Sequence, residues 1–141
     1  MINWYKKVVF ENYANFNGRA RRSEFWYFTL CNIIISLIFY IPMVFSIILT
    51  ASNNEDISIL FFLFYGIFLI YQLGIFLPNL AVFIRRLHDI NKSGWNILVY
   101  FIPIAGPIMI IIWLCRDSDI HSNKWGPNPK ASYSEIEEIG L

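Results

Sequence analysis

Two short blocks of charged residues are the part of this sequence whose residue types could do chemistry. Their members are Arg19, Arg21, Arg22 and Glu24 in the first block and Arg85, Arg86, His88 and Asp89 in the second. Guanidinium groups bind phosphate through paired hydrogen bonds, and basic residues beside a membrane attract anionic lipid by about 1 kcal/mol per charge. The blocks therefore predict a site for lipid phosphate or for a partner protein, although basic residues there could equally serve only to set topology.

Glu24 is the exception in the first block, because it is an acid directly before a long apolar run. A carboxylate at the mouth of a membrane span is stable only beside a cation. The second block follows another apolar run and would return to the same side. We therefore predict an ion pair between Glu24 and either Arg85 or Arg86.

His88 and Asp89 are adjacent, which raises the question of proton transfer or metal binding. Neighbouring residues do not share one face of a helix, and the second block has no further His or carboxylate at the spacing that metal sites use. We therefore expect no catalytic residue, no metal or other cofactor, and no enzyme activity.

Three amides interrupt the apolar runs, and they are Asn32, Gln72 and Asn79. The main expectation for such residues is hydrogen bonding between helices. A buried substrate site is the alternative. No ionisable residue lies deep in these runs, which argues against ion-coupled pumping.

Composition predicts the elements that must position these residues. Hydrophobic residues make up 57% of the 141 residues and charged residues only 15%, whereas soluble domains carry about 25% charged residues. No Lys or Arg lies between Arg22 and Arg85. The chain is thus predicted to be an all-α, polytopic membrane protein with one membrane domain over residues 1–129 and a flexible polar tail over residues 130–141.

Three apolar segments are predicted, at about residues 25–50, 57–84 and 95–115. The first two are long enough to span a hydrocarbon core, which takes about 20 residues. Pro103 and Pro107 break the third segment. It either crosses the membrane as two half-helices or returns as a re-entrant hairpin, and the sequence leaves both open.

The amino terminus alternates aromatic and apolar residues with Lys6, Lys7 and Glu11, which predicts an amphipathic helix in the membrane interface. Basic residues gather before the first segment and after the second. By the positive-inside rule, the amino terminus and the second loop are expected in the cytoplasm. A crossing third segment would place the basic residues of the tail outside, against this rule, so the side of the tail stays open.

Several motifs together resemble the domain of unknown function 805 family of small bacterial inner-membrane proteins. The motifs are Gly18-Arg19-Ala20-Arg21-Arg22-Ser23-Glu24-Phe25-Trp26, Arg85-Arg86-Leu87-His88-Asp89, Ser93-Gly94-Trp95, Pro103-Ile104-Ala105-Gly106 and Trp125-Gly126-Pro127-Asn128-Pro129. The resemblance runs from Trp4 to about Pro129. It implies a bacterial inner-membrane location and no particular activity.

The functional expectation is a noncatalytic membrane module that binds anionic lipid headgroups or a partner protein through the charged blocks. The alternative is an oligomeric transporter or channel subunit, built from copies of this chain or with another membrane protein. No nucleic acid partner is expected.

Overall fold

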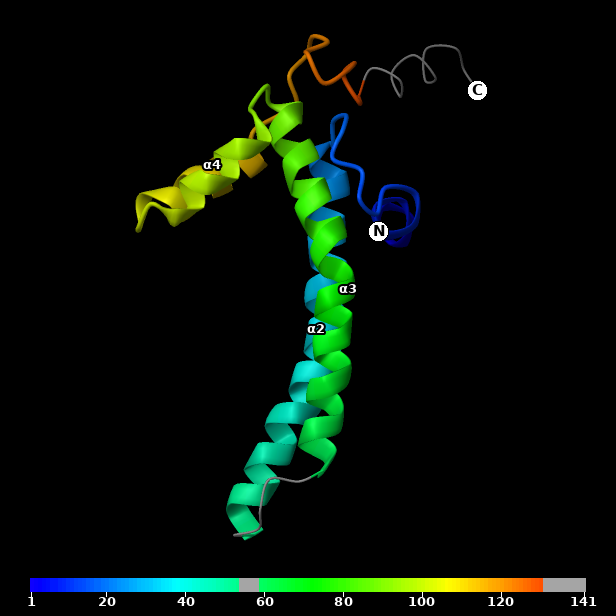
Figure 1. Ribbon diagram of the computed structural model, residues 1–141, viewed down its shortest axis with the longest axis vertical. Helices are drawn as coiled ribbons and strands as arrows, with labels where there is room; N and C mark the ends of the chain where they lie inside the picture. Colours follow the sequence, from blue (N-terminus) through cyan, green and yellow to red (C-terminus); the bar gives the residue numbers. More distant parts are fainter. Residues whose placement is uncertain (54–58, 131–141) are drawn as a thin grey trace.

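Two long antiparallel helices form the body of the molecule in a computed structural model that describes residues 1–53 and 59–130 (Figure 1). They are α2 (Arg22–Asn53) and α3 (Ile59–Asp89). Both are long and apolar enough to cross a membrane, and few residues in their most apolar stretches are buried. The expected helical membrane fold is confirmed.

The helices extend beyond the predicted apolar segments. α3 continues past Ile84 to Asp89, so the second charged block lies on the last turns of a helix and not in a loop. The charged side chains of this block are buried and paired within the chain. The start of the charged block therefore does not mark the end of the helix. Part of the predicted first loop and most of the predicted tail, residues 54–58 and 131–141, lie outside the described residues.

Both helices contain a proline, Pro42 in α2 and Pro78 in α3. Each proline removes one backbone hydrogen bond. The far end of α2, beyond Pro42, curves away from α3 (Figure 1). The pair is therefore most closely packed near the end that carries the charged blocks.

The amino-terminal segment is helical, as predicted. α1 (Ile2–Lys6) passes directly into η1 (Lys7–Glu11), a short π-helix. The ring of Tyr5 stacks on that of Phe28 with centroids 5.6 Å apart, and Val8 is fully buried while Phe10 is exposed. One face of this segment thus packs on α2, and it lies beside the charged end of the helix pair (Figure 1).

The third apolar segment is a hairpin. It consists of η2 (Gly94–Phe101), a 3-10 helix, and α4 (Ala105–Cys115), which pack against each other. Ile104, just after Pro103, has a φ of 64°, which reverses the chain between them. Both ends of the segment lie at the carboxyl end of α3 (Figure 1), so the geometry matches the re-entrant alternative.

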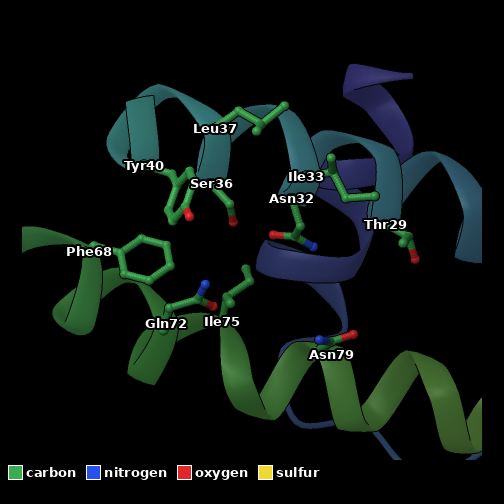
Figure 2. Close-up of a pocket in the computed structure, with 10 residues that line it drawn as sticks. All are labelled: Thr29, Asn32, Ile33, Ser36, Leu37, Tyr40, Phe68, Gln72, Ile75 and Asn79. Atoms are coloured by element: carbon green, nitrogen blue, oxygen red, sulfur yellow. The ribbon is translucent and has the colours of Figure 1, made fainter. Parts of the chain in front are cut away.

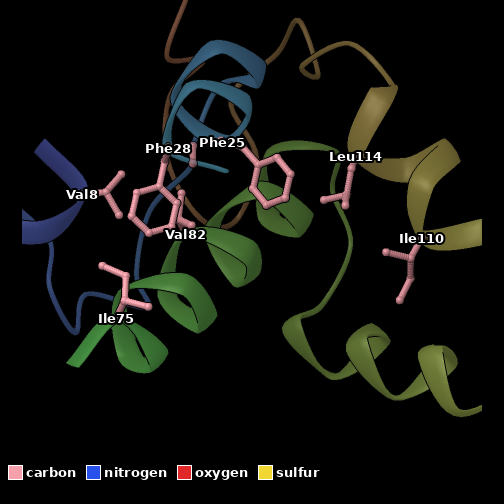
Figure 3. Close-up of a cluster of buried hydrophobic side chains, with 8 residues drawn as sticks. Val8, Phe25, Phe28, Ile75, Val82, Ile110 and Leu114 are labelled. Atoms are coloured by element: carbon pink, nitrogen blue, oxygen red, sulfur yellow. The ribbon is translucent and has the colours of Figure 1, made fainter. Parts of the chain in front are cut away.

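A small apolar core ties these elements together where they meet (Figure 3). Its buried members come from η1, α2, α3 and α4 and the loop before α2: Val8, Ala20, Phe25, Phe28, Ile75, Val82, Ile110 and Leu114. Most of the hairpin lies outside this core, with Trp95 78% and Phe101 79% exposed. A surface so apolar is stable only in a lipid environment.

Replacement of Gly106 by Ala should open the hairpin. A β-carbon at this position would lie 2.1 Å from the carbonyl oxygen of Val99, so the backbone must move apart. We expect a loss of about 1–3 kcal/mol in unfolding free energy, measured by circular dichroism during denaturant titration in detergent micelles. Gly66→Ala is the matched control, because nothing lies within 4 Å of its added carbon, and equal losses in both variants would contradict the close packing.

Candidate functional site

Asp89 lies at the centre of a buried network at the charged end of the helix pair, and its side chain is fully buried. One carboxylate oxygen, Oδ1, accepts from Arg19 Nε at 3.1 Å. The other, Oδ2, accepts from Arg86 Nη1 and, at 2.6 Å, from the hydroxyl of Ser118. One acid therefore joins the first block, the second block and the segment after α4.

Arg19 also holds the chain that follows α4. Its Nη1 donates to the carbonyl oxygens of His121 at 2.9 Å and Gly126 at 3.3 Å. Its Nη2 donates to those of Asp119 at 2.6 Å and Asp89 at 3.2 Å. The planar guanidinium thereby donates to four backbone carbonyl oxygens and fixes the segment after α4 against the first block.

Arg86 likewise donates to backbone carbonyl oxygens, here at the end of α4. Its Nε and Nη2 each donate to the carbonyl oxygen of Leu114 at 3.2 Å, and Nη2 also donates to that of Arg116. The last carbonyls of a helix lack partners within the helix. Arg86 therefore caps α4 and attaches the base of the hairpin to α3.

Glu24 forms the second buried ion pair, and its partner is Arg85. The distance from Arg85 Nη1 to Glu24 Oε1 is 2.7 Å, and Lys7 Nζ lies 3.6 Å from Oε2. The backbone N–H of Ala20 donates to the carbonyl oxygen of Arg85 at 3.0 Å. Of the two partners predicted for Glu24, the structure thus selects Arg85, which fastens the start of α2 to the end of α3.

His88 has a packing role in this arrangement. Its ring stacks on that of Trp125 with centroids 4.4 Å apart, and its Nδ1 lies 3.3 Å from the carbonyl oxygen of Gly18. Asn123 Nδ2 donates to the His88 carbonyl at 2.9 Å. Within residues 1–53 and 59–130, no group of three or more His, Cys, Asp or Glu side chains is placed to hold a metal ion.

Arg21 and Arg22 lie at the edge of the network. The Arg21 guanidinium lies 5.6 Å from the ring centroid of Trp4. Arg22 Nη1 is 3.3 Å from Asp117 Oδ1, which Lys130 Nζ also approaches to 2.9 Å, and these groups are exposed. Hydrogen bonds from Lys130 and Arg22 lower the pKa of the Asp117 carboxyl group.

The structure therefore divides the predicted cluster. Six members are buried together, namely Arg19, Glu24, Arg85, Arg86, His88 and Asp89, while Arg21 and Arg22 stay at the rim. Sequence reasoning missed Ser118, Asn123 and the carbonyls that Arg19 binds. The motif from Trp125 to Pro129 was a signal that this segment is ordered, but nothing in its residue types indicated a contact with Arg19.

The three amides of the apolar segments line a separate feature, a cavity of about 370 Å³ between α2 and α3 (Figure 2). Asn32 Oδ1 accepts from the hydroxyl of Tyr71 at 2.5 Å, and its Nδ2 donates to the carbonyl of Phe28 at 3.1 Å. This is the interhelical hydrogen bond expected of such residues. Gln72 and Asn79 line the same cavity.

Comparison with known proteins agrees with the motifs in this network. The model of a family described as protein of unknown function (DUF805) matches residues 13–127. The chain belongs to the DUF805 family. That span contains both charged blocks, the hairpin and Trp125, so the resemblance inferred from the motifs is confirmed.

Two Escherichia coli K12 proteins are similar to this DUF805 protein over nearly their whole length. Inner membrane protein YhaI is 36% identical over 129 residues, which cover 92% of this chain and 97% of the relative. Inner membrane protein YhaH is 37% identical over 130 residues, covering 92% and 98%. No solved structure matches the chain.

Replacement of Asp89 by Asn should strongly destabilise this DUF805 protein. The change leaves Arg19 and Arg86 buried without a countercharge, which costs about 3–5 kcal/mol. Unfolding free energy, measured by denaturant titration in micelles, reports the loss. Asp117→Asn is the matched control, because that acid also faces two cations but is exposed, and we expect little change there. Similar effects of the two variants would contradict the central role of Asp89.

Proposed function

We propose that this protein is a noncatalytic, multi-pass module of the bacterial inner membrane that binds anionic lipid headgroups through the basic rim around its buried network. The location is supported by relatives named inner membrane proteins. The lipid role is supported by one observation above all, which is the pairing of rim cations with aromatic rings. These pairs lie at the charged end of the helix pair, where α1 and the η2–α4 hairpin project.

The buried arginines are unsuited to bind lipid themselves. Arg19, Arg85 and Arg86 are almost completely buried and face internal carboxylates or carbonyls. The proposed contacts therefore belong to the rim, whose basic members include Lys6, Lys7, Arg21, Arg22, Lys92 and Arg116. A partner protein with an acidic surface would bind to these same rim residues.

Cation and ring lie together at several rim positions. Lys7 Nζ is 5.2 Å from the ring centroid of Trp4, and Lys92 Nζ is 4.2 Å from that of Trp113. Tryptophan and basic side chains share a preference for the headgroup layer. α1 and the η2–α4 hairpin project sideways at this same end (Figure 1), as elements in the interface would.

The orientation of the chain in the membrane is also part of the proposal. The hairpin returns the chain to the end of α3, which puts Arg116, Lys124 and Lys130 beside the amino-terminal basic block. With all of these charges on one side, the positive-inside rule favours a cytoplasmic location for both the amino terminus and the segment after α4.

The oligomeric transporter or channel subunit is the second candidate. It is favoured by the cavity between α2 and α3, whose lining includes three amides in otherwise apolar spans. A single helix pair encloses no pore, so this function requires assembly of several copies.

The lipid proposal predicts a charge-dependent preference for anionic bilayers. In nanodiscs that mix phosphatidylglycerol with phosphatidylcholine, native mass spectrometry should find phosphatidylglycerol retained by the full chain. Joint replacement of Arg21, Arg22 and Arg116 by Gln should weaken retention by about fivefold per charge removed. High salt should weaken it too.

The matched control replaces the same three arginines by Lys, which keeps the charge. Retention of phosphatidylglycerol by the Lys variant but not by the Gln variant supports the proposal. Equal retention by all three proteins would refute it, and so would capture of an acidic protein with no lipid preference.

The orientation predicts that both ends of the chain face the cytoplasm. A fluorescent reporter that folds only in the cytoplasm should be active when fused after Leu141, and a phosphatase that needs the periplasm should be inactive there. The opposite pattern would mean that the third segment crosses the membrane.

A further inference from the structure

A mostly apolar pocket lies beside the last turns of α3, where the loop before α2 and the start of the hairpin meet that helix. Its volume is about 400 Å³, which is within the range of small-molecule sites. Its polar lining residues are Asn17, His88 and Ser93. Most of the wall is apolar and is formed by Phe16, Leu80, Ile84, Trp95 and Ile97.

One ring nitrogen of His88 has no partner. The other, Nδ1, lies 3.3 Å from the carbonyl oxygen of Gly18. A carbonyl oxygen only accepts, so Nδ1 carries the hydrogen of the neutral ring and Nε2 is left as an acceptor. Across residues 1–53 and 59–130, no group donates to Nε2. His88 is only 8% exposed, and an acceptor so nearly buried calls for a donor.

Gly94 shows that Nε2 faces the pocket. A β-carbon at Gly94 would lie 3.7 Å from His88 Nε2 and 2.9 Å from Cγ2 of Ile84. All three residues line the pocket, so Nε2 lies at its wall and a side chain at position 94 would cover it. Glycine therefore keeps the acceptor accessible from inside the pocket.

The pocket changes from polar to apolar along α3. Leu80, Ile84 and His88 are spaced four residues apart, so they lie on one face of the helix over a rise of about 12 Å. His88 is on the last turn, and Ile84 and Leu80 are successively closer to the middle of the helix. With the charged end at the membrane surface, a bound molecule would place its polar group near the headgroups and its apolar part toward the bilayer centre.

The apolar side of the pocket continues toward the middle of α3. A smaller hollow of about 190 Å³ has Phe76 and Phe83 in its lining. Leu80 and Ile97 line both this hollow and the pocket, so the two are adjacent. Together they offer a path along α3 for an apolar chain longer than the pocket itself.

The lining determines the class of molecule that fits. Among the described residues, no carboxylate lines the pocket to balance an ammonium group, and no Lys or Arg lines it to balance a phosphate. The acceptor on His88 matches a hydroxyl, and Asn17 and Ser93 can each donate to the oxygen of that hydroxyl. An uncharged lipid alcohol, which has a hydroxyl and a long apolar body, meets these conditions.

We propose that this pocket binds a lipid alcohol such as diacylglycerol, whose hydroxyl donates to His88 Nε2 while its apolar part lies along Ile84 and Leu80. The site differs from the basic rim, because its ligand is uncharged and its lining contains none of the rim cations. Binding of anionic lipid at the rim and binding of an alcohol in the pocket can each fail without the other.

The chain has two histidines, His88 and His121, so nitrogen-15 labelling of histidine gives a site-specific NMR readout. The full chain is placed in nanodiscs of neutral phosphatidylcholine, which excludes anionic lipid from the result, and dioleoylglycerol is added. The His88 Nε2 resonance should move as this nitrogen accepts a hydrogen bond, whereas His121 should not respond. Trioleoylglycerol is the matched control, because acylation removes the donor, and it should move neither resonance.

Two variants test the pocket in different ways. His88→Phe keeps a ring beside Trp125 but has no acceptor, and it should retain dioleoylglycerol about 3- to 10-fold less in native mass spectrometry. Gly94→Ala keeps His88 but puts a methyl group against Nε2 and Ile84, so it should also weaken retention. His121→Phe is the matched control outside the pocket, and its retention should be unchanged.

Three results would overturn the proposal. They are a His88 resonance that does not move at saturating dioleoylglycerol, equal responses to dioleoylglycerol and trioleoylglycerol, and retention that neither pocket variant weakens. A spectrum with the hydrogen on Nε2 in place of Nδ1 would overturn it as well. If circular dichroism shows that His88→Phe loses helicity, the resonance of the unmodified chain and the retention by Gly94→Ala decide the outcome.

Discussion

The whole arrangement depends on how a mostly apolar chain accommodates charge at one end of its two long helices. Asp89 receives two guanidinium groups and a hydroxyl in a site closed to solvent. A buried ion pair is of uncertain net benefit, but breaking one leaves an unpaired charge at high cost. The network therefore acts chiefly as a constraint, since few other placements of the surrounding segments satisfy all of its members.

That constraint explains why segments with little mutual apolar contact are nevertheless held together. The hairpin is attached to α3 through Arg86 and the carbonyl of Leu114, and the chain after it is attached through Arg19. Apolar packing alone could not orient these segments, because lipid is as apolar as their side chains. Directional hydrogen bonds from the guanidinium groups therefore fix the orientation of these segments, which the hydrophobic effect cannot do in a membrane.

The molecule has two polar features, the buried charged network and the cavity between α2 and α3, and they differ in how their polar groups are paired. At the charged end the buried carboxylates of Glu24 and Asp89 each have a cation within the chain, although Nε and Nη2 of Arg85 and the Ser23 hydroxyl have no partner among the described residues. In the cavity between α2 and α3 the amides are uncharged, and Gln72 and Asn79 have no hydrogen-bond partner within the part of the chain that the structure describes. The charged end is held by ion pairs within the chain, whereas the amides of the cavity keep unused hydrogen-bonding capacity between the two helices.

The amino-acid sequence by itself determined the helical membrane class, the two long apolar helices, the break at Pro103 and a cation partner for Glu24. These follow from composition, length and charge, which act locally or through the bilayer. Only the tertiary structure decided that α3 continues to Asp89, that the third segment returns, and that Arg85 and not Arg86 pairs with Glu24. It also decided that Arg19 and Arg86 face inward to carbonyls of the segment after α4. Backbone carbonyls are the same in every residue, so a sequence carries no sign of which ones a distant arginine will bind.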